Sequence, residues 1–161
     1  MRTIVLMRHG KSSRKHDVED RERPLKSRGL RDSELVAKQL IRKVNLPERI
    51  FFSPAKRALN TCKNVLKTIQ TSDKHVVVDE DLYDFHGESV INFLKKLPDD
   101  YHEVMIFGHN HAFTSISNIF GDRLIENLPT SGLVKINIDI QNWKDSKQGT
   151  TEFIIIPKEL K

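Results

Sequence analysis

Two histidines and two arginines stand where short apolar segments end or where a helix is expected to begin. Arg8 and His9 directly follow the apolar residues 3–7, His109 follows a second apolar segment, and Arg57 lies near the start of a helical pattern. A neutral imidazole can attack phosphorus and form a phosphohistidine, which water later cleaves. An arginine presents paired N–H donors that suit the oxygens of a phosphate. These residue types therefore predict phosphoryl chemistry.

Each of these residues can be given a role in such a reaction. His9 is the predicted nucleophile, Arg8 and Arg57 are predicted to bind the phosphoryl oxygens, and His109 is predicted to donate a hydrogen bond to them. Gly10 removes a side chain where the backbone must approach the ligand. Since these side chains supply the positive charge, we expect no metal and no cofactor, and we expect phosphate or sulfate to bind in the site.

The predicted secondary structure places these residues at one edge of a sheet. Apolar runs predict strands over residues 3–7, 49–52, 76–78 and 104–107, with a closing pair over 133–140 and 151–156. Helical patterns cover residues 27–44, 89–97, 112–120 and a segment that Ser53 would cap, with Pro54 in its first turn. Alternating strands and helices predict an α/β fold, a three-layer αβα sandwich with a mainly parallel central sheet. The carboxyl ends of such strands share one ligand-binding crevice.

Composition limits the class of protein. The 161 residues, 37% hydrophobic and 30% charged, predict a single domain over residues 1–161. No apolar run approaches the roughly 18 residues that span a bilayer, so no membrane partner is expected. The single Cys62 excludes an intramolecular disulfide, which favours a cytoplasmic location.

The net charge of +5 supports an anionic ligand, because much of the excess lies between Arg8 and Arg31. A nucleic-acid partner is not expected from this segment. It interleaves acidic residues with the basic ones and lacks aromatic side chains on which bases could stack.

Three motifs resemble those of the histidine phosphatase superfamily, which includes the phosphoglycerate mutases. Residues 6–10 (LMRHG) resemble its Arg-His-Gly signature, residues 53–61 (SPAKRALNT) its serine-proline and arginine motif, and residues 107–110 (FGHN) its late histidine. Residues 22–29 (ERPLKSRG) and 129–132 (PTSG) are similar to segments of the SixA-type phosphohistidine phosphatases. The resemblance implies a phosphoglycerate mutase-like fold, His9 as nucleophile, and a phosphate pocket of Arg8, Arg57 and His109.

Two further residues each have two interpretations. Arg23 either lines the entrance of the pocket as part of the Arg-Pro-Leu segment or is an exposed loop charge. Asn110 either binds substrate or caps the helix that follows it.

The substrate is the least determined feature of the sequence. Larger members of the superfamily carry a glutamate that protonates an alcohol leaving group, and here Glu80, Asp81, Asp84 and Glu88 are the nearby acids. A phosphorylated imidazole can carry its own proton, so the lack of a clear acid favours phosphohistidine in a protein. The alternatives are a small phosphorylated metabolite as substrate, or a non-catalytic phosphate-binding domain.

Overall fold

The structure, a computed structural model, describes residues 1–72 and 74–161 and contains one central six-stranded sheet. Its strand order is β3-β2-β4-β1-β5-β6. The strands are β1 (Arg2–Arg8), β2 (Arg49–Phe52), β3 (His75–Val78), β4 (Glu103–Gly108), β5 (Leu133–Ile138) and β6 (Thr150–Ile155). Strands β3, β2, β4 and β1 pair in parallel, whereas β5 is antiparallel to both of its neighbours, β1 and β6.

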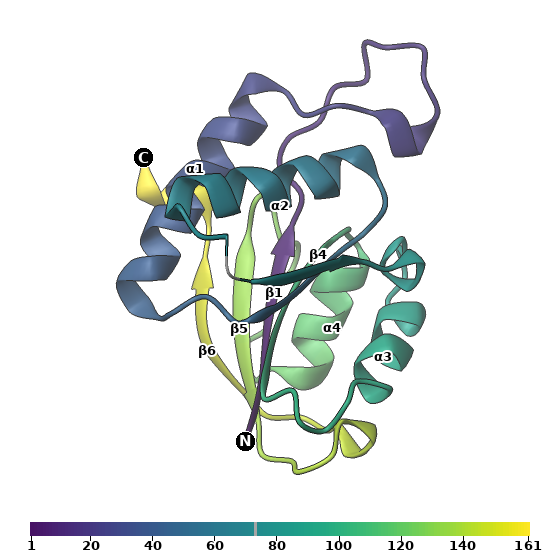
Figure 1. Cartoon of the computed structure of the whole chain (residues 1–161), viewed down its shortest axis with the longest axis vertical. Coiled ribbons are helices and arrows are strands. Elements are labelled where there is room, and N and C mark those ends of the chain that lie inside the picture. The colour runs from purple at the N-terminus through teal and green to yellow at the C-terminus, as the bar shows by residue number, and fades with distance from the viewer. Residues whose placement is uncertain (73) are drawn as a thin grey trace.

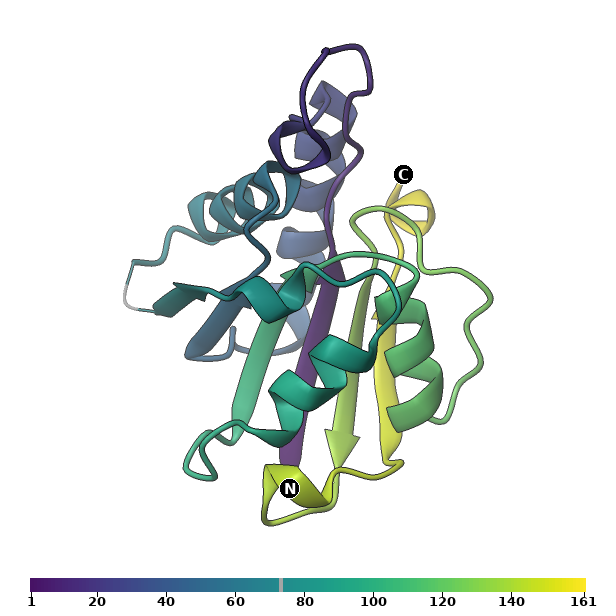
Figure 2. The ribbon, with the colours of Figure 1, turned by 90° about the vertical axis from the view of Figure 1, so that its right-hand side faces the viewer.

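Helices cover both faces of the sheet, as Figures 1 and 2 show. Helices α1 and α2 contact one another, as do α3 and α4. The helices are α1 (Ser27–Lys43), α2 (Lys56–Ile69), α3 (Glu88–Lys95) and α4 (Ala112–Phe120). This arrangement confirms the predicted three-layer sandwich with a mainly parallel sheet.

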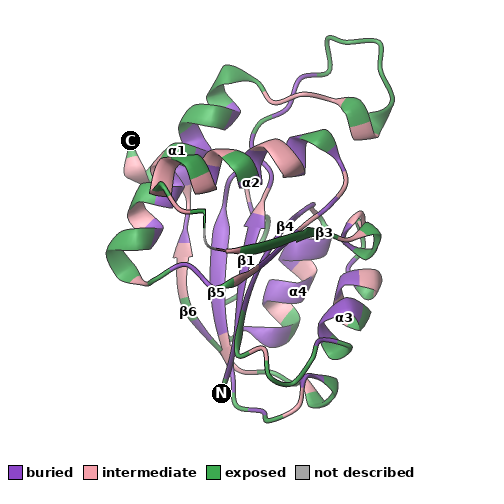
Figure 3. Cartoon of the chain, viewed as in Figure 1, coloured by how far each residue is buried: buried purple, intermediate pink, exposed green. Residues whose placement is uncertain are grey.

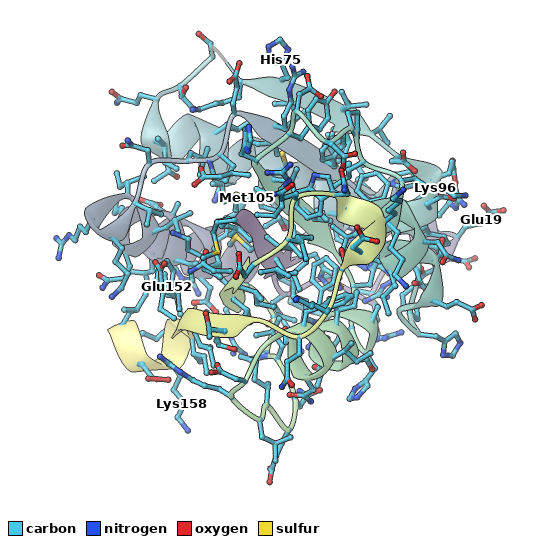
Figure 4. All side chains as sticks on the ribbon, turned by 90° about the horizontal axis from the view of Figure 1, so that it is seen from below. Glu19, His75, Lys96, Met105, Glu152 and Lys158 are labelled. Carbon is cyan, nitrogen blue, oxygen red and sulfur yellow. The ribbon has the colours of Figure 1, made fainter. Side chains whose placement is uncertain are left out.

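The central strands β1 and β4 are apolar in their middle, at Ile4–Met7 and Val104–Phe107, because both of their faces are covered. Successive side chains of a strand point to opposite faces, so β1 contributes Ile4 and Leu6 to one hydrophobic core and Val5 and Met7 to the other. Figure 3 shows β1 and β5 as buried strands, whereas β3 is exposed at the sheet edge. Viewed from below, Met105 of β4 lies in the middle of the packed side chains (Figure 4).

The start of α2 differs from the sequence prediction. The helix begins at Lys56 and its N-cap is Ala55, so Ser53 does not cap it and Pro54 precedes its first turn. The Ser53 hydroxyl instead accepts the backbone N–H of Ala55 and contacts His109. Ser53 contacts His109 because β2 and β4 are parallel neighbours, so the residues that follow them lie at the same edge of the sheet.

The long connection between β1 and α1 forms an arm that projects from one end of the molecule (Figure 1). An isolated antiparallel bridge joins Ser12 to Leu25 near the base of the arm, and Asp20–Glu22 forms a single 3-10 turn farther out. Among the described residues, no helix is long and apolar enough to cross a membrane.

Candidate active site

Backbone hydrogen bonds hold three strand ends together at the carboxyl edge of the sheet. The His9 N–H donates to the Gly108 carbonyl and the Ser53 N–H donates to the Phe107 carbonyl, each at 3.0 Å. The strands involved, β2, β4 and β1, are neighbours in the sheet. The predicted crevice at the strand ends is therefore where the chemically active side chains meet.

The His9 ring is fixed in one orientation and one tautomer. Its Nδ1 lies 2.7 Å from the Gly10 carbonyl oxygen, which can only accept, so Nδ1 carries the proton. The lone pair is then on Nε2, and the Arg57 Nε donates to this atom at 3.3 Å. His9 thus presents an unprotonated nitrogen next to a guanidinium.

Burial keeps both site histidines neutral. It lowers the pKa of His9 to about 3, against the opposing hydrogen bond to Gly10, and the nearby charges of Arg57 and Arg8 act in the same direction as burial. Burial, followed by the charge of Arg57, likewise lowers the pKa of His109 to about 3. A neutral imidazole at pH 7 is the form that can act as a nucleophile.

His109 is completely buried beside His9, with 5.4 Å between the ring centroids. Its Nε2 lies 2.7 Å from the Ser53 hydroxyl, which already accepts an N–H and can donate its own proton to this nitrogen. That assignment leaves the proton on Nδ1, a buried atom with no hydrogen-bond partner among the described residues. Tyr83 and Phe85 pack against the same ring.

The two predicted arginines are buried to different extents. Arg57 is only 2% exposed and reaches the site from the first turn of α2, while Arg8 is partly buried and donates to the Leu128 carbonyl at 2.8 Å. Thr61 secures the position of Arg57: its hydroxyl donates to the Arg57 carbonyl at 2.7 Å and accepts the Gly10 N–H at 2.9 Å. A buried guanidinium of this kind requires an anionic partner.

That partner within the molecule is Asp20, which the sequence analysis did not single out. Its carboxylate accepts from the Arg57 Nη2 at 2.9 Å, from the Arg23 Nη1 at 3.0 Å and from the Tyr83 hydroxyl at 2.5 Å. Burial opposes ionisation of Asp20, but these three hydrogen bonds outweigh it and hold its pKa well below the ordinary value. In the sequence, the only indication that Asp20 could belong to the site is its place in the long polar segment after His9.

The site opens into a cavity of about 360 Å³, which is at the small end of the range for ligand pockets. Arg8, His9 and Arg57 line it, and so do Arg23 and Asn110. Its other lining residues are Lys11, Ser12, Arg14, Asp20, Lys26, Phe85 and Thr130. His109 and Gly10 are not among its lining residues.

The structure shows where the side chains of Arg23 and Asn110 lie, although each residue had two interpretations from the sequence. Arg23 lines the cavity and is held by Asp20 and by the Ser12 hydroxyl. Asn110 both lines the cavity and accepts the backbone N–H of Thr114 in the first turn of α4 at 3.1 Å. The role of either residue toward substrate stays a prediction.

Gly10 lacks a side chain at a position where it contacts α1 closely, a constraint that the sequence analysis did not consider. A Cβ on Gly10 would lie 2.8 Å from the Gly29 carbonyl oxygen in α1, and a Cβ on Gly29 would lie 2.5 Å from the Lys11 carbonyl oxygen. The two glycines allow the arm to pass close against the first turns of α1. Gly10 therefore makes room for a helix, and the expected approach of its backbone to the ligand stays a prediction.

The four acids considered as proton donors lie outside the cavity wall. Glu80 is exposed and pairs with Arg21, and Asp84 accepts backbone N–H groups at the start of α3. Asp81 and Glu88 lie in a separate surface hollow with Asp84. Of the described carboxyl groups, only that of Asp20 lines the cavity.

Comparison with known proteins places the chain in a family. The sequence profile of the histidine phosphatase superfamily (branch 1) matches residues 4–90, so the chain belongs to this superfamily. It is a phosphatase of that superfamily, as its motifs predicted. The uncharacterized protein Rv1276c of Mycobacterium tuberculosis is 25% identical over 160 residues, which cover 92% of this chain and 96% of that protein.

Solved structures confirm the fold. A tungstate complex of the protein histidine phosphatase SixA superimposes with a TM-score of 0.83 at 22% identity, covering 99% of each chain. Phosphoserine phosphatase from Entamoeba histolytica, in complex with 3-phosphoglyceric acid, has a TM-score of 0.67 at 14% identity and covers 100% of each chain. Since proteins with different substrates share this architecture, the fold alone does not select the substrate.

The lowered pKa values give a direct prediction for histidine titration. In a nitrogen-detected NMR titration, His9 and His109 should remain neutral from pH 7 down to about pH 4.5, because their pKa values are about 3. The unfolded chain binds these protons near pH 6.5, so stability should fall as the pH decreases below that value. Protonation of either ring with a midpoint near pH 6.5 would contradict the assigned electrostatics.

Replacing Asp20 should strengthen the binding of oxyanions. In Asp20→Asn, Arg57 loses the carboxylate that an incoming oxyanion has to replace. Tungstate or phosphate should then inhibit at concentrations at least about tenfold lower, since hydrogen bonds to charged groups contribute about 1.5–3 kcal/mol. The exposed neighbour Glu19 (Figure 4) supplies the matched control, Glu19→Gln, which should leave inhibition unchanged. Equal or weaker inhibition of Asp20→Asn would show that Asp20 does not compete for the site.

Proposed function

We propose that this protein hydrolyses phosphohistidine in a protein substrate, through a covalent phosphoryl intermediate on His9 and without a metal ion. The observation that carries the proposal is the state of His9. Its Nδ1 proton is engaged by the Gly10 carbonyl, which leaves Nε2 unprotonated, and the only hydrogen bond that Nε2 accepts among the described residues is the 3.3 Å contact from the Arg57 Nε, which a phosphoryl group would replace.

In the first step, the Nε2 lone pair of His9 attacks phosphorus and the bond from phosphorus to the leaving nitrogen breaks. The leaving imidazole takes the bonding electron pair and departs neutral, since it already carries a proton on its other nitrogen or receives one from solvent. Arg8, Arg57 and the Nδ1–H of His109 are the proposed donors to the phosphoryl oxygens.

In the second step, water attacks phosphorus and the bond to Nε2 breaks, which returns the lone pair to His9 and releases phosphate. The phosphorylated ring keeps its Nδ1–H on the Gly10 carbonyl and is therefore a cation, which is a better leaving group than a neutral or anionic ring. The same hydrogen bond thus serves both steps.

The acid–base composition of the cavity supports phosphohistidine as the substrate. Among the described residues, Asp20 is the one carboxyl group that lines the cavity, and its lowered pKa keeps it ionised. An ionised carboxylate cannot protonate an alkoxide, so sugar and alkyl phosphates lack the proton donor that their cleavage needs. Phosphohistidine needs no such donor.

Metal independence is part of the proposal and follows from the charges of the site. Six cationic side chains and a single carboxylate line the cavity, which is an unfavourable environment for a divalent cation. The described residues hold no cluster of three or more potential ligands among His, Cys, Asp and Glu side chains. The arginines supply the positive charge that a metal would otherwise bring.

The leaving group gives the sharpest test of this proposal. Across substituted aryl phosphates, the rate should depend steeply on leaving-group pKa, and a phosphohistidine peptide should be cleaved at least about 10²-fold faster than an alkyl phosphate. His9→Ala should abolish all turnover, whereas Glu80→Ala should not alter the slope, and a chelator should not change the rates.

Three results would contradict the proposal. A flat dependence on leaving-group pKa would reveal a positioned acid and would favour a phosphorylated metabolite as the substrate. Turnover by His9→Ala would exclude the covalent route. Loss of activity with chelator, restored by a divalent ion, would exclude metal independence.

A further inference from the structure

The mouth of the cavity carries more positive charge than a phosphoryl group requires. A phosphoryl group brings a charge of about −1.5 to −2, which Arg8 and Arg57 already match. Asp20 neutralises part of the charge of Arg23. Lys11, Arg14 and Lys26 remain, all three exposed and lining the same cavity.

These three cations have no partner within the part of the chain that the structure describes. No hydrogen bond or ion pair is formed by the side chains of Lys11, Arg14 or Lys26, whereas Arg21 on the same arm is paired with Glu80. The arm also carries acidic residues that could have paired with these cations, but none of Asp17, Glu19 and Glu22 lines the cavity. Three unpaired cations of the arm therefore face the site, whereas Lys15, which also has no side-chain partner among the described residues, does not line the cavity.

The backbone of the arm fixes this arrangement. The bridge between Ser12 and Leu25 is antiparallel, and the Lys26 N–H donates to the Lys11 carbonyl at 2.8 Å, so the two lysines are directly opposite each other. On the other side of the bridge, the Ser13 N–H donates to the Pro24 carbonyl at 2.8 Å, and Arg14 follows directly after Ser13. Like charges directly opposite on an antiparallel pair are destabilising. The Lys11–Lys26 pair at the rim of the cavity, with Arg14 close by, is explained by an anion that binds between these cations.

We propose that Lys11, Arg14 and Lys26 form an anion subsite that binds carboxylates flanking the phosphohistidine of an acidic protein segment. The inference rests on the proposed function, because it assumes that the phosphoryl group is delivered on a polypeptide. Such a segment would lie along the arm with its phosphorylated imidazole directed at His9. Complementary charge of this kind raises association rates and selects among partners.

The test compares two phosphohistidine peptides of equal length, one with aspartate or glutamate on both sides of the phosphorylated residue and one with glutamine at those positions. The wild-type enzyme should cleave the acidic peptide with a kcat/KM about tenfold higher at low salt. The advantage should shrink as salt is added, since both partners are exposed.

The variant Lys11→Gln/Arg14→Gln/Lys26→Gln should bring the ratio between the two peptides close to one. A matched control removes three positive charges from the opposite edge of the sheet, at exposed positions after β5 and at the end of α3: Lys95→Gln/Lys144→Gln/Lys147→Gln. This control should keep the wild-type ratio, which separates the subsite from an effect of net charge.

Each other outcome overturns the inference in a distinguishable way. Equal cleavage of both peptides by the wild-type enzyme would exclude the subsite while leaving the proposed function intact. If the wild-type enzyme cleaves neither peptide, the result would contradict the proposed function and therefore also the inference that rests on it. A preference for a small bisphosphate over its monophosphate, lost in the triple variant without a change in the peptide ratio, would assign the cations to a metabolite instead.

Discussion

The hydrogen bond from the His9 Nδ1 to the Gly10 carbonyl is the interaction on which the proposed chemistry depends. It fixes the ring tautomer, because a carbonyl oxygen can only accept, and so it leaves the lone pair on Nε2 beside Arg57. It also orients the ring without adding a charge. The Gly10 carbonyl must point back toward the His9 ring. The hydrogen bond from the Gly10 N–H to the Thr61 hydroxyl holds the backbone in this conformation.

The rest of the site keeps that imidazole neutral and close to positive charge. Burial disfavours the protonated form of His9, and the neighbouring guanidinium groups add to the effect. Two positively charged arginines next to a buried cationic histidine would be strongly repulsive, so neutrality of the ring is what allows the cluster to form. Without a phosphoryl group, Asp20 supplies the anion that the buried Arg57 needs. The arm that carries Asp20 also carries the unpaired cations, which gives this one segment two electrostatic roles.

Much of this arrangement could be predicted from the sequence. The continuous apolar run of β1 indicated a strand covered on both faces, and the alternation of strands and helices indicated the layers. Because parallel strands share one edge at their carboxyl ends, His9 and His109 could be brought together from residues 100 positions apart. Arg57 could be predicted as a phosphate ligand from its position near the start of a helix, but nothing in that position indicated that its side chain is buried.

Other features depend on contacts that have no local signature. Trp143 lies in a polar segment between the last two strands, yet it is completely buried and its indole N–H donates to the Tyr101 carbonyl at 2.8 Å. Asp20 became part of the site only through the path of the arm, which no periodicity encodes. The close approach of Gly10 and Gly29 likewise joins segments whose spacing carries no pattern.

The central claim is that Nε2 of His9 is the atom that accepts the phosphoryl group, and it can be tested by trapping the intermediate. The enzyme would be mixed with a labelled phosphohistidine peptide and denatured rapidly in base, in which a phosphoramidate survives. Proteolysis, mass spectrometry and phosphorus NMR would then locate the phosphate. We expect it on His9, bonded to Nε2, in the wild-type protein. Phosphate on Nδ1, on a serine or on Cys62, or the absence of any phosphoenzyme during turnover, would contradict this account.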